Sequence, residues 1–199
     1  VYSGGFAKKK QSLDQTHQVM AFPAPGYLHK DIYAAHLLAG ILGGGMSSRL
    51  FQEARERRGL CYSTFAHMSA FSDTGLLQVY AGTAPETAKE FTKVASDILL
   101  TATKDVTQEE LDRARAQLKA SLVMSLESPS SRADQIARQY LAYGYVPDIS
   151  TLLEKVQAVS VEDVSRVAQK TFSGVALSMA AVGDVSQLAK YDELAASFA

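Results

Sequence analysis

Strand-like segments lie near both ends of the chain, whereas residues 86 to about 173 are almost wholly helical in pattern. Residues 17–22 form a short apolar run that stops at a proline, and residues 175–182 form another close to the C-terminus. Because a strand needs partners, the last strand must join a sheet that the N-terminal segment begins. The sequence therefore predicts a single α+β domain over residues 1–199, with helices on one face of a mostly antiparallel sheet.

Two more strands are expected in the first half of the chain, at residues 60–70 and 75–83. A cluster of polar turn formers separates them, which favours an antiparallel pair. Residues 32–42 have the apolar content of a buried helix, and the spacing of Thr107 and Glu110 predicts a capping box at the start of a later helix. No internal repeat, low-complexity tract or linker divides the sequence.

The stretch from residue 39 to residue 62 has the most unusual composition, because an apolar helix runs into three consecutive glycines, Gly43 to Gly45. Glycine lets another backbone come close, so this run indicates either a flexible loop or tight packing against a neighbour. Ser47 and Ser48 are good N-cap residues for a short charged helix. Gly59 suits the left-handed position that closes that helix just before the next strand.

Composition argues against several classes of function. Hydrophobic residues make up 47% of the chain and charged residues 21%, as in a globular protein rather than a disordered one. A formal net charge of −1 gives no reason to expect nucleic acid or an acidic membrane as a partner. No apolar run reaches the roughly 18 residues that a membrane span needs. The lysines at 8–10 are interpreted as a solvated turn after a first strand.

The single cysteine, Cys61, cannot form an internal disulfide, which fits a reducing compartment. Its position at the start of a strand predicts a buried, inert thiol. The N-terminus has neither a start methionine nor a signal pattern. The chain is therefore expected to be the interior of a longer polypeptide.

Residues with metal-binding or nucleophilic chemistry are sparse. None of the four histidines, His17, His29, His36 and His67, begins a His-x-x-Glu-His or His-Glu-x-x-His pattern, and no cysteine–histidine cluster is present. There is no Gly-x-Ser-x-Gly elbow, and the glycine run lacks the Gly-Lys-Ser/Thr ending of a phosphate-binding loop. The sequence therefore predicts no catalytic zinc site within this chain alone.

A longer motif surrounds the glycines. The run Gly-Gly-Gly-Met-Ser-Ser-Arg-Leu-Phe-Gln-Glu at 43–53 is followed by Arg55, seven positions before Tyr62, and then by Phe-Ser-Asp-Thr-Gly-Leu at 71–76. This motif resembles the C-terminal half of M16-family zinc metallopeptidases, the relatives of mitochondrial processing peptidase and pitrilysin. The resemblance extends from about Gly4 to the end of the chain, and it implies the LuxS/MPP-like α+β fold. It also implies that zinc and the His-x-x-Glu-His motif belong to an N-terminal domain or partner subunit, so that this chain alone is inactive.

The resemblance assigns roles to the central stretch. In this family an arginine and a tyrosine at the spacing of Arg55 and Tyr62 are understood to hold the substrate backbone and to stabilise the oxyanion across a central chamber. A glycine-rich loop at the position of Gly43, Gly44 and Gly45 would border the peptide path. From the residues alone, the alternating charges of the short helix would instead form a solvated face, and Tyr62 would be a core tyrosine with a satisfied hydroxyl.

The implied function is that of the zinc-free half of a zinc endopeptidase that cleaves peptides or presequences. Its partners would be an N-terminal zinc-bearing domain or subunit and extended peptide substrates; a free copy is also expected to self-associate as a homodimer. Two alternatives stay open: a non-catalytic scaffold or assembly subunit of the same fold, like the respiratory core proteins, and a small-ligand module that uses the glycine loop. We expect a bacterial cytoplasmic location, with the mitochondrial matrix as the alternative.

Overall fold

The computed structural model describes residues 2–199, and five of its elements are strands of one sheet. They are β1 (Gly5–Lys10), β2 (Thr16–Ala24), β3 (Ser63–Ala70), β4 (Gly75–Thr83) and β5 (Ser178–Gly183). The strand order is β1-β5-β2-β4-β3, and only the β1–β5 pair is parallel. The predicted mostly antiparallel sheet, in which the last strand joins the first two, is therefore confirmed.

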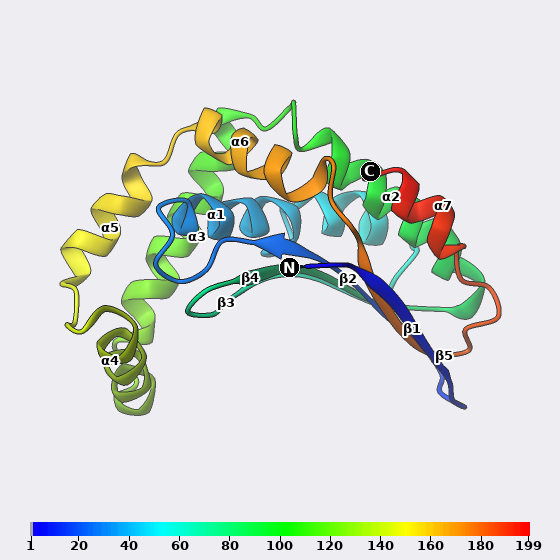
Figure 1. Ribbon diagram of the computed structural model, residues 1–199, viewed down its shortest axis with the longest axis horizontal. Helices are drawn as coiled ribbons and strands as arrows, with labels where there is room; N and C mark the ends of the chain where they lie inside the picture. The colour runs from blue at the N-terminus through cyan, green and yellow to red at the C-terminus, as the bar shows by residue number, and fades with distance from the viewer. Residues whose placement is uncertain (1) are drawn as a thin grey trace.

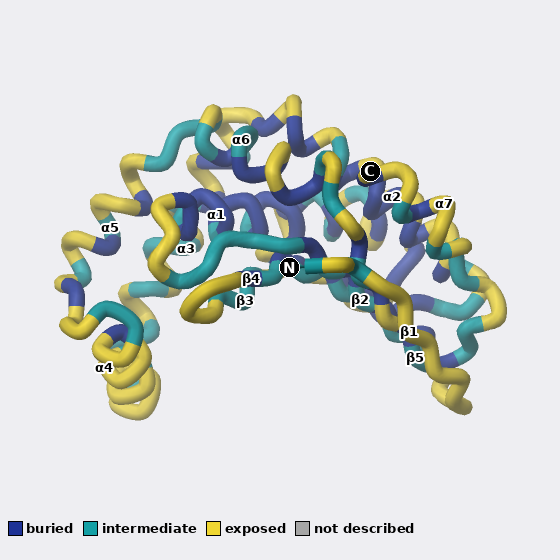
Figure 2. Tube along the Cα trace, in the orientation of Figure 1, coloured by how far each residue is buried: buried dark blue, intermediate teal, exposed yellow. Residues whose placement is uncertain are grey.

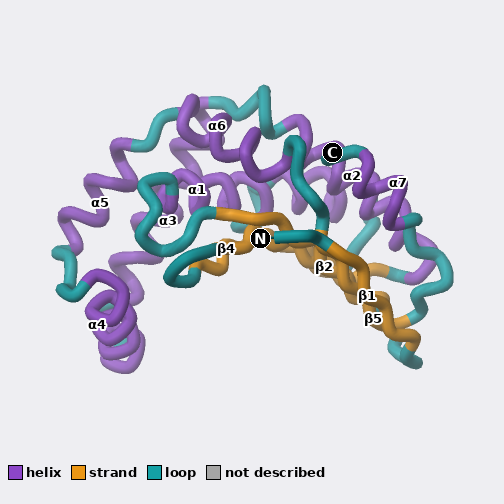
Figure 3. The backbone as a smooth tube through the Cα atoms, viewed as in Figure 1, coloured by secondary structure: helices purple, strands orange, loops and turns teal. Residues whose placement is uncertain are grey.

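Helices cover one face of the sheet and leave the other face open (Figure 1). The backbone tube of Figure 3 shows the same two layers. None of the helices in the described residues is long and apolar enough to cross a membrane. In chain order the helical elements are α1 (Ile32–Gly43), the π-helix η1 (Phe51–Arg57), the short 3-10 helix η2 (Pro85–Thr87), α2 (Ala88–Thr101), α3 (Gln108–Ser125), α4 (Pro129–Tyr143), α5 (Ile149–Ala158), α6 (Val161–Phe172) and α7 (Tyr191–Ala196).

Alternation along β2 shows how the sheet divides core from surface. Its residues alternate between buried and half-buried, and the buried set, which includes Met20 and Phe22, faces the helices. Helix α1 is largely buried, as its apolar sequence predicts. Phe22 meets Phe172 of α6 edge to face, with ring centroids 5.1 Å apart. This contact joins the helical layer to the sheet.

Helix α4 projects beyond the sheet at one end of the molecule and is largely exposed (Figure 1, Figure 2). The Ser128 hydroxyl accepts from the Ser131 N–H at 3.3 Å to cap its start, and Gly144 ends it in the left-handed conformation, at φ 76°. The side chains of Tyr140 and Leu141 are exposed. This end of the domain therefore presents apolar groups to solvent.

The predicted capping box is present at the start of α3. The Thr107 hydroxyl accepts from the Glu110 N–H at 3.2 Å, and the Glu110 carboxylate accepts from the Thr107 N–H at 2.9 Å. Both bonds satisfy N–H groups that the first helical turn leaves without partners. The start of α3 is therefore defined by residues that lie next to each other in the sequence.

Two predictions about the strands are wrong. Strand β3 begins at Ser63 rather than at residue 60, because the Leu60 N–H still bonds to the Ala54 carbonyl, at 2.8 Å. The lysines at 8–10 lie within the exposed strand β1 at an edge of the sheet, and not in a turn. Charged side chains on an edge strand discourage pairing with other chains, so these lysines protect that edge.

Candidate functional site

The glycine run does not form one uniform loop. Gly43 is the buried last residue of α1, and a Cβ there would lie 2.2 Å from a backbone nitrogen of β3. A Cβ on Gly44 would lie 2.7 Å from the Gly40 Cα, whereas one on Gly45 would meet only the Gln117 side chain, at 3.1 Å. Gly43 therefore lets the end of α1 pack closely against β3. Gly44 and Gly45 are the more accessible part of the run.

The charged helix after the glycines begins at Ser48, whose carbonyl accepts from the Gln52 N–H at 3.0 Å. The predicted cap by a serine hydroxyl is wrong, because the Ser48 hydroxyl donates to the Gly45 carbonyl at 2.6 Å. The helix continues as η1, and wide π-type turns are frequent at functional sites. Gly59 follows in the left-handed conformation, at φ 62°, as the sequence predicts.

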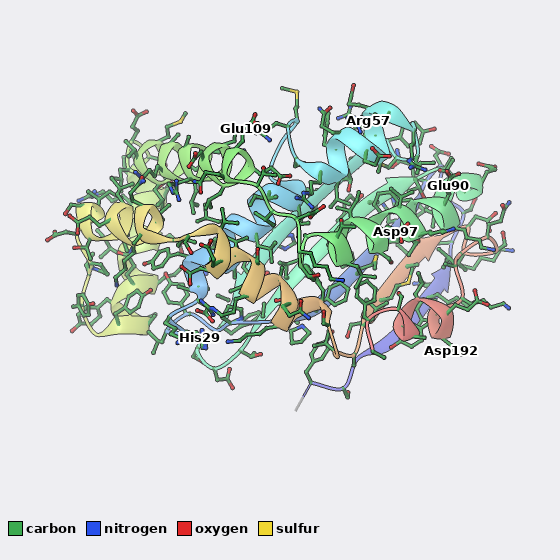
Figure 4. All side chains as sticks on the ribbon, turned by 90° about the horizontal axis from the view of Figure 1, so that it is seen from above. His29, Arg57, Glu90, Asp97, Glu109 and Asp192 are labelled. Atoms are coloured by element: carbon green, nitrogen blue, oxygen red, sulfur yellow. The ribbon has the colours of Figure 1, made fainter. Side chains whose placement is uncertain are left out.

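Carboxylates hold three of the four arginines in this stretch. Arg57 and Arg58 both pair with Glu53, at 3.0 and 2.8 Å, which are the solvated pairs that alternating charge predicts. Arg58 also lies 4.0 Å from Glu90 of α2. Figure 4, seen from above, shows Arg57 and Glu90 at the outer edge of the helical layer. Arg49 pairs with two acidic residues near the start of α3, each at 2.6 Å.

Arg55 differs from these neighbours because no carboxylate holds it. Among residues 2–199, which the structure describes, the guanidinium of Arg55 has no ion pair and no side-chain hydrogen bond. Its central carbon lies 4.6 Å from the centre of the Phe51 ring, a cation–π contact that orients the side chain. The guanidinium donors therefore remain available for another molecule.

Tyr62 lies between η1 and β3, and its N–H donates to the Gly82 carbonyl at 2.9 Å. Its side chain is 61% exposed, so the interpretation of Tyr62 as a core tyrosine is wrong. The preceding residue, Cys61, is buried as predicted. Burial raises the pKa of the Cys61 thiol to about 11, and the charge of Arg55 opposes that shift. In the described part of the chain, neither the Arg55 guanidinium nor the Tyr62 hydroxyl has a hydrogen-bond partner, so both side chains can donate to another molecule.

The histidines do not form a zinc site. His17 Nδ1 lies 2.7 Å from the Tyr80 hydroxyl, and His29 Nδ1 accepts from a backbone N–H two residues on, at 3.1 Å. His36 lies in α1, where burial lowers the pKa of the imidazole, and His67 lies on β3. Nowhere in the described residues do three or more His, Cys, Asp or Glu side chains gather in a way that could hold a metal ion. Within residues 2–199, no set of side chains therefore matches the ligand set of a zinc site.

The cavities do not favour a small-ligand site at the glycines. The space beside Ser47, Ser48 and Gln117 has a volume of about 10 Å³, whereas drug-sized ligands need roughly 300 Å³ or more. A much larger cavity, of about 540 Å³, lies elsewhere, against Tyr143 and Arg166. The accessible glycines thus border a surface rather than a ligand pocket.

The chain is similar to a known family and to several bacterial proteins. The sequence model of one family, described as the Peptidase M16 inactive domain, matches residues 3–118. An uncharacterized zinc protease of Mycobacterium tuberculosis is 38% identical over 164 residues, which cover 82% of this chain and 37% of that protein. One from Rickettsia felis is 34% identical over 179 residues, which cover 89% of this chain and 43% of that protein. YmxG of Bacillus subtilis, also named as an uncharacterized zinc protease, is 32% identical over 166 residues, covering 83% and 41%. The chain thus spans about two fifths of the length of these relatives.

Two solved structures share the fold. A chain in the structure titled "Complex III2 from Candida albicans, Inz-5 bound" has a TM-score of 0.90 at 22% identity, covering 100% of this chain and 49% of its own length. A protease from Helicobacter pylori has a TM-score of 0.79 at 26% identity, and the match covers 89% of this chain and 43% of that protease chain. These likenesses confirm the predicted α+β fold.

Proposed function

The chain belongs to the M16 peptidase family, and we propose that it forms the zinc-free C-terminal half of a zinc endopeptidase that cleaves peptides or presequences. Similarity to proteins named as zinc proteases supports this proposal. The partner is an N-terminal domain or subunit that carries zinc and the His-x-x-Glu-His motif. Without that partner this chain hydrolyses no peptide. The bacterial origin of the relatives supports a cytoplasmic location.

Arg55 and Tyr62 have the chemistry to stabilise the charge that develops during peptide hydrolysis. Zinc in the other half would supply the activated water. As water adds to the scissile carbonyl, negative charge grows on its oxygen, and the Tyr62 hydroxyl can donate to that atom. The permanently charged guanidinium of Arg55 can bind the substrate backbone and share the same charge. Because both donors are free beforehand, no existing ion pair has to break when the substrate arrives.

The accessible glycines border the peptide path in this proposal. Gly44 and Gly45 lie between α1 and the helix that carries Arg55, where the absence of side chains lets a peptide backbone come close. Gly43 supports this part of the path indirectly, since it packs the end of α1 against β3. We therefore assign substrate contact to Gly44 and Gly45 and packing to Gly43.

One observation carries the proposal: Arg55 is the arginine of this stretch that no carboxylate neutralises. The test combines this chain with its zinc-bearing half and measures peptide hydrolysis. Arg55→Ala and Tyr62→Phe should each lower kcat by about 10²-fold or more, the usual loss of one oxyanion donor. Zinc content and the affinity between the two halves should stay unchanged.

Two matched controls are available. Arg57→Ala removes an arginine from the same helix, but one that is paired with Glu53. Tyr140→Phe removes the hydroxyl of a tyrosine that is 61% exposed, like Tyr62, but lies on α4. Both controls should cleave at the wild-type rate. Full-rate cleavage by Arg55→Ala and Tyr62→Phe would show that the assigned roles are wrong.

A scaffold or assembly subunit is the alternative function. The chain in the Complex III structure shows that this fold occurs in a large assembly. The same reconstitution separates the two functions, because a scaffold would form the assembly with its partner and cleave no peptide.

A domain prepared without its partner should self-associate, since α4 exposes apolar side chains such as Leu141.

A further inference from the structure

A cluster of aromatic rings follows Tyr62 on the sheet. Phe65 of β3 lies opposite Tyr80 of β4, and their stacked rings have centroids 4.7 Å apart. His17 of β2 extends the cluster, with its ring centroid 6.0 Å from that of Tyr80. The His67 ring lies 5.7 Å from Phe65. Phe65, His67, Tyr80 and His17 together form what we call the aromatic patch.

The aromatic patch lies on the face of the sheet that the helices leave open. Along β3, Phe65 and His67 are exposed, whereas Thr64 and Ala66, which alternate with them, are buried on the helical side. Tyr80 is half-buried and lies between two buried residues of β4. Figure 1 shows no helix of the described residues over this part of the open face.

The described strands around the aromatic patch, β2, β3, β4 and β5, carry no acidic side chain, lysine or arginine. A charged side chain placed there would lose water without gaining a partner. The Phe65 side chain is 42% exposed, so its ring still has apolar surface to bury. The chemistry of the patch therefore suits an aromatic or large apolar side chain.

Hydrogen bonding keeps the patch in place. His17 Nδ1 lies 2.7 Å from the Tyr80 hydroxyl, which limits rotation of both rings. Next to them, Gly82 has no side chain, and a Cβ there would lie 3.3 Å from both the Tyr80 hydroxyl and the Ser63 hydroxyl. The patch thus combines a preorganised apolar surface with polar groups at one border. Binding surfaces that are preorganised lose less entropy when a ligand arrives.

We infer that the aromatic patch is a side-chain subsite of the peptidase, and this inference rests on the proposed function. Tyr62 and Phe65 are three residues apart, so their Cα atoms are separated by at most about 11 Å. An extended peptide covers that distance with about three residues. The aromatic patch therefore binds an aromatic or large apolar side chain within about three residues of the scissile bond.

The test measures side-chain preference in the assembly of this chain with its zinc-bearing half. Peptides carrying Phe, Leu, Ala or Lys at each position near the cleaved bond are compared. At one position, peptides with Phe or Leu should have a kcat/KM about tenfold or more above that of the Lys peptide, mainly because their KM is lower. Phe65→Ala should abolish that preference by raising KM for the Phe and Leu peptides. Phe71→Ala, which removes an exposed ring at the hairpin turn, should keep the preference.

A second measurement is independent of catalysis. Fluorescence anisotropy on the chelator-treated assembly reports binding of the same peptides when none is cleaved. The assembly could cleave no peptide and still bind Phe peptides more tightly than Lys peptides, with that preference lost in Phe65→Ala. This result would support the subsite and contradict the proposed function. If the preference survives in Phe65→Ala, or if this variant weakens only the association of the two halves, the inference is overturned. Urea unfolding of Phe65→Ala shows whether the sheet itself remains stable.

Discussion

Arg49 donates to both carboxylate oxygens of Glu110, with Nε 2.6 Å from Oε1 and Nη2 2.8 Å from Oε2. The same carboxylate accepts from the Thr107 N–H in the capping box of α3. One acidic side chain thus joins the start of α3 to the helix that follows the glycine run. Because that helix carries Arg55, the Arg49–Glu110 pair fixes the base of the candidate site.

Removal of this pair should destabilise the fold. Arg49→Ala leaves the partly buried Glu110 without its bidentate charged partner, and we expect the free energy of unfolding to fall by about 2–3 kcal/mol. Arg113→Ala is the control, because Arg113 pairs with Glu109 on the exposed side of α3 and such pairs contribute less than about 0.5 kcal/mol. Urea titrations followed by circular dichroism measure both values. Equal losses in the two variants would contradict the structural role of Arg49.

Stability should decrease in acid partly through Asp31. A hydrogen bond from Arg166, at 2.7 Å, lowers the pKa of the Asp31 carboxyl despite its burial. A carboxyl with a depressed folded pKa stabilises the protein above its unfolded pKa of about 3.9, and this stabilisation is lost as the pH falls through the folded pKa. The free energy of unfolding should therefore fall below about pH 5, and Asp31→Asn should flatten that part of the curve. Asp134→Asn, at an exposed pair on α4, should leave the curve unchanged.

Two adjacent glycine positions should respond differently to alanine. Gly43→Ala places a Cβ 2.2 Å from a backbone nitrogen of β3, so α1 or β3 must move, at a cost of about 1–3 kcal/mol. Gly45→Ala meets only the end of the flexible Gln117 side chain, and its effect on unfolding should stay within about 0.5 kcal/mol. Thermal and urea unfolding compare the two variants. A larger loss of stability in Gly45→Ala than in Gly43→Ala would contradict the close approach of β3 to Gly43.

The Cys61 thiol should be unreactive in the folded protein. Burial raises its pKa to about 11, so about one thiol in a thousand is ionised at pH 8, and only the thiolate reacts readily. Ellman's reagent should therefore label the native protein slowly and the urea-unfolded protein rapidly. Fast, complete labelling of the native protein would show that Cys61 is accessible.

Short-range signals predicted much of the secondary structure. The Thr107–Glu110 capping box and the left-handed Gly59 both occur as predicted, because caps and tight turns depend on residues a few positions apart. The pairing of Phe65 with Tyr80 was not predicted, because alternation within a strand does not give the register between two strands. Nor could local spacing show that His17, from a strand more than forty residues earlier, lies beside them.

The sequence by itself determined the order of helices and strands and, through the motif around Arg55 and Tyr62, the family. Only the tertiary structure decided which arginine is free. Arg49 is held by residues 56 and 61 positions away, and such pairings leave no trace in local spacing. Likewise, the lysines at 8–10 became an exposed edge strand because the distant β5 pairs with them. Contacts between segments far apart in the chain depend on how the sheet and helices pack. Within the described residues, that packing gives Arg49 its carboxylate partners and leaves Arg55 without one.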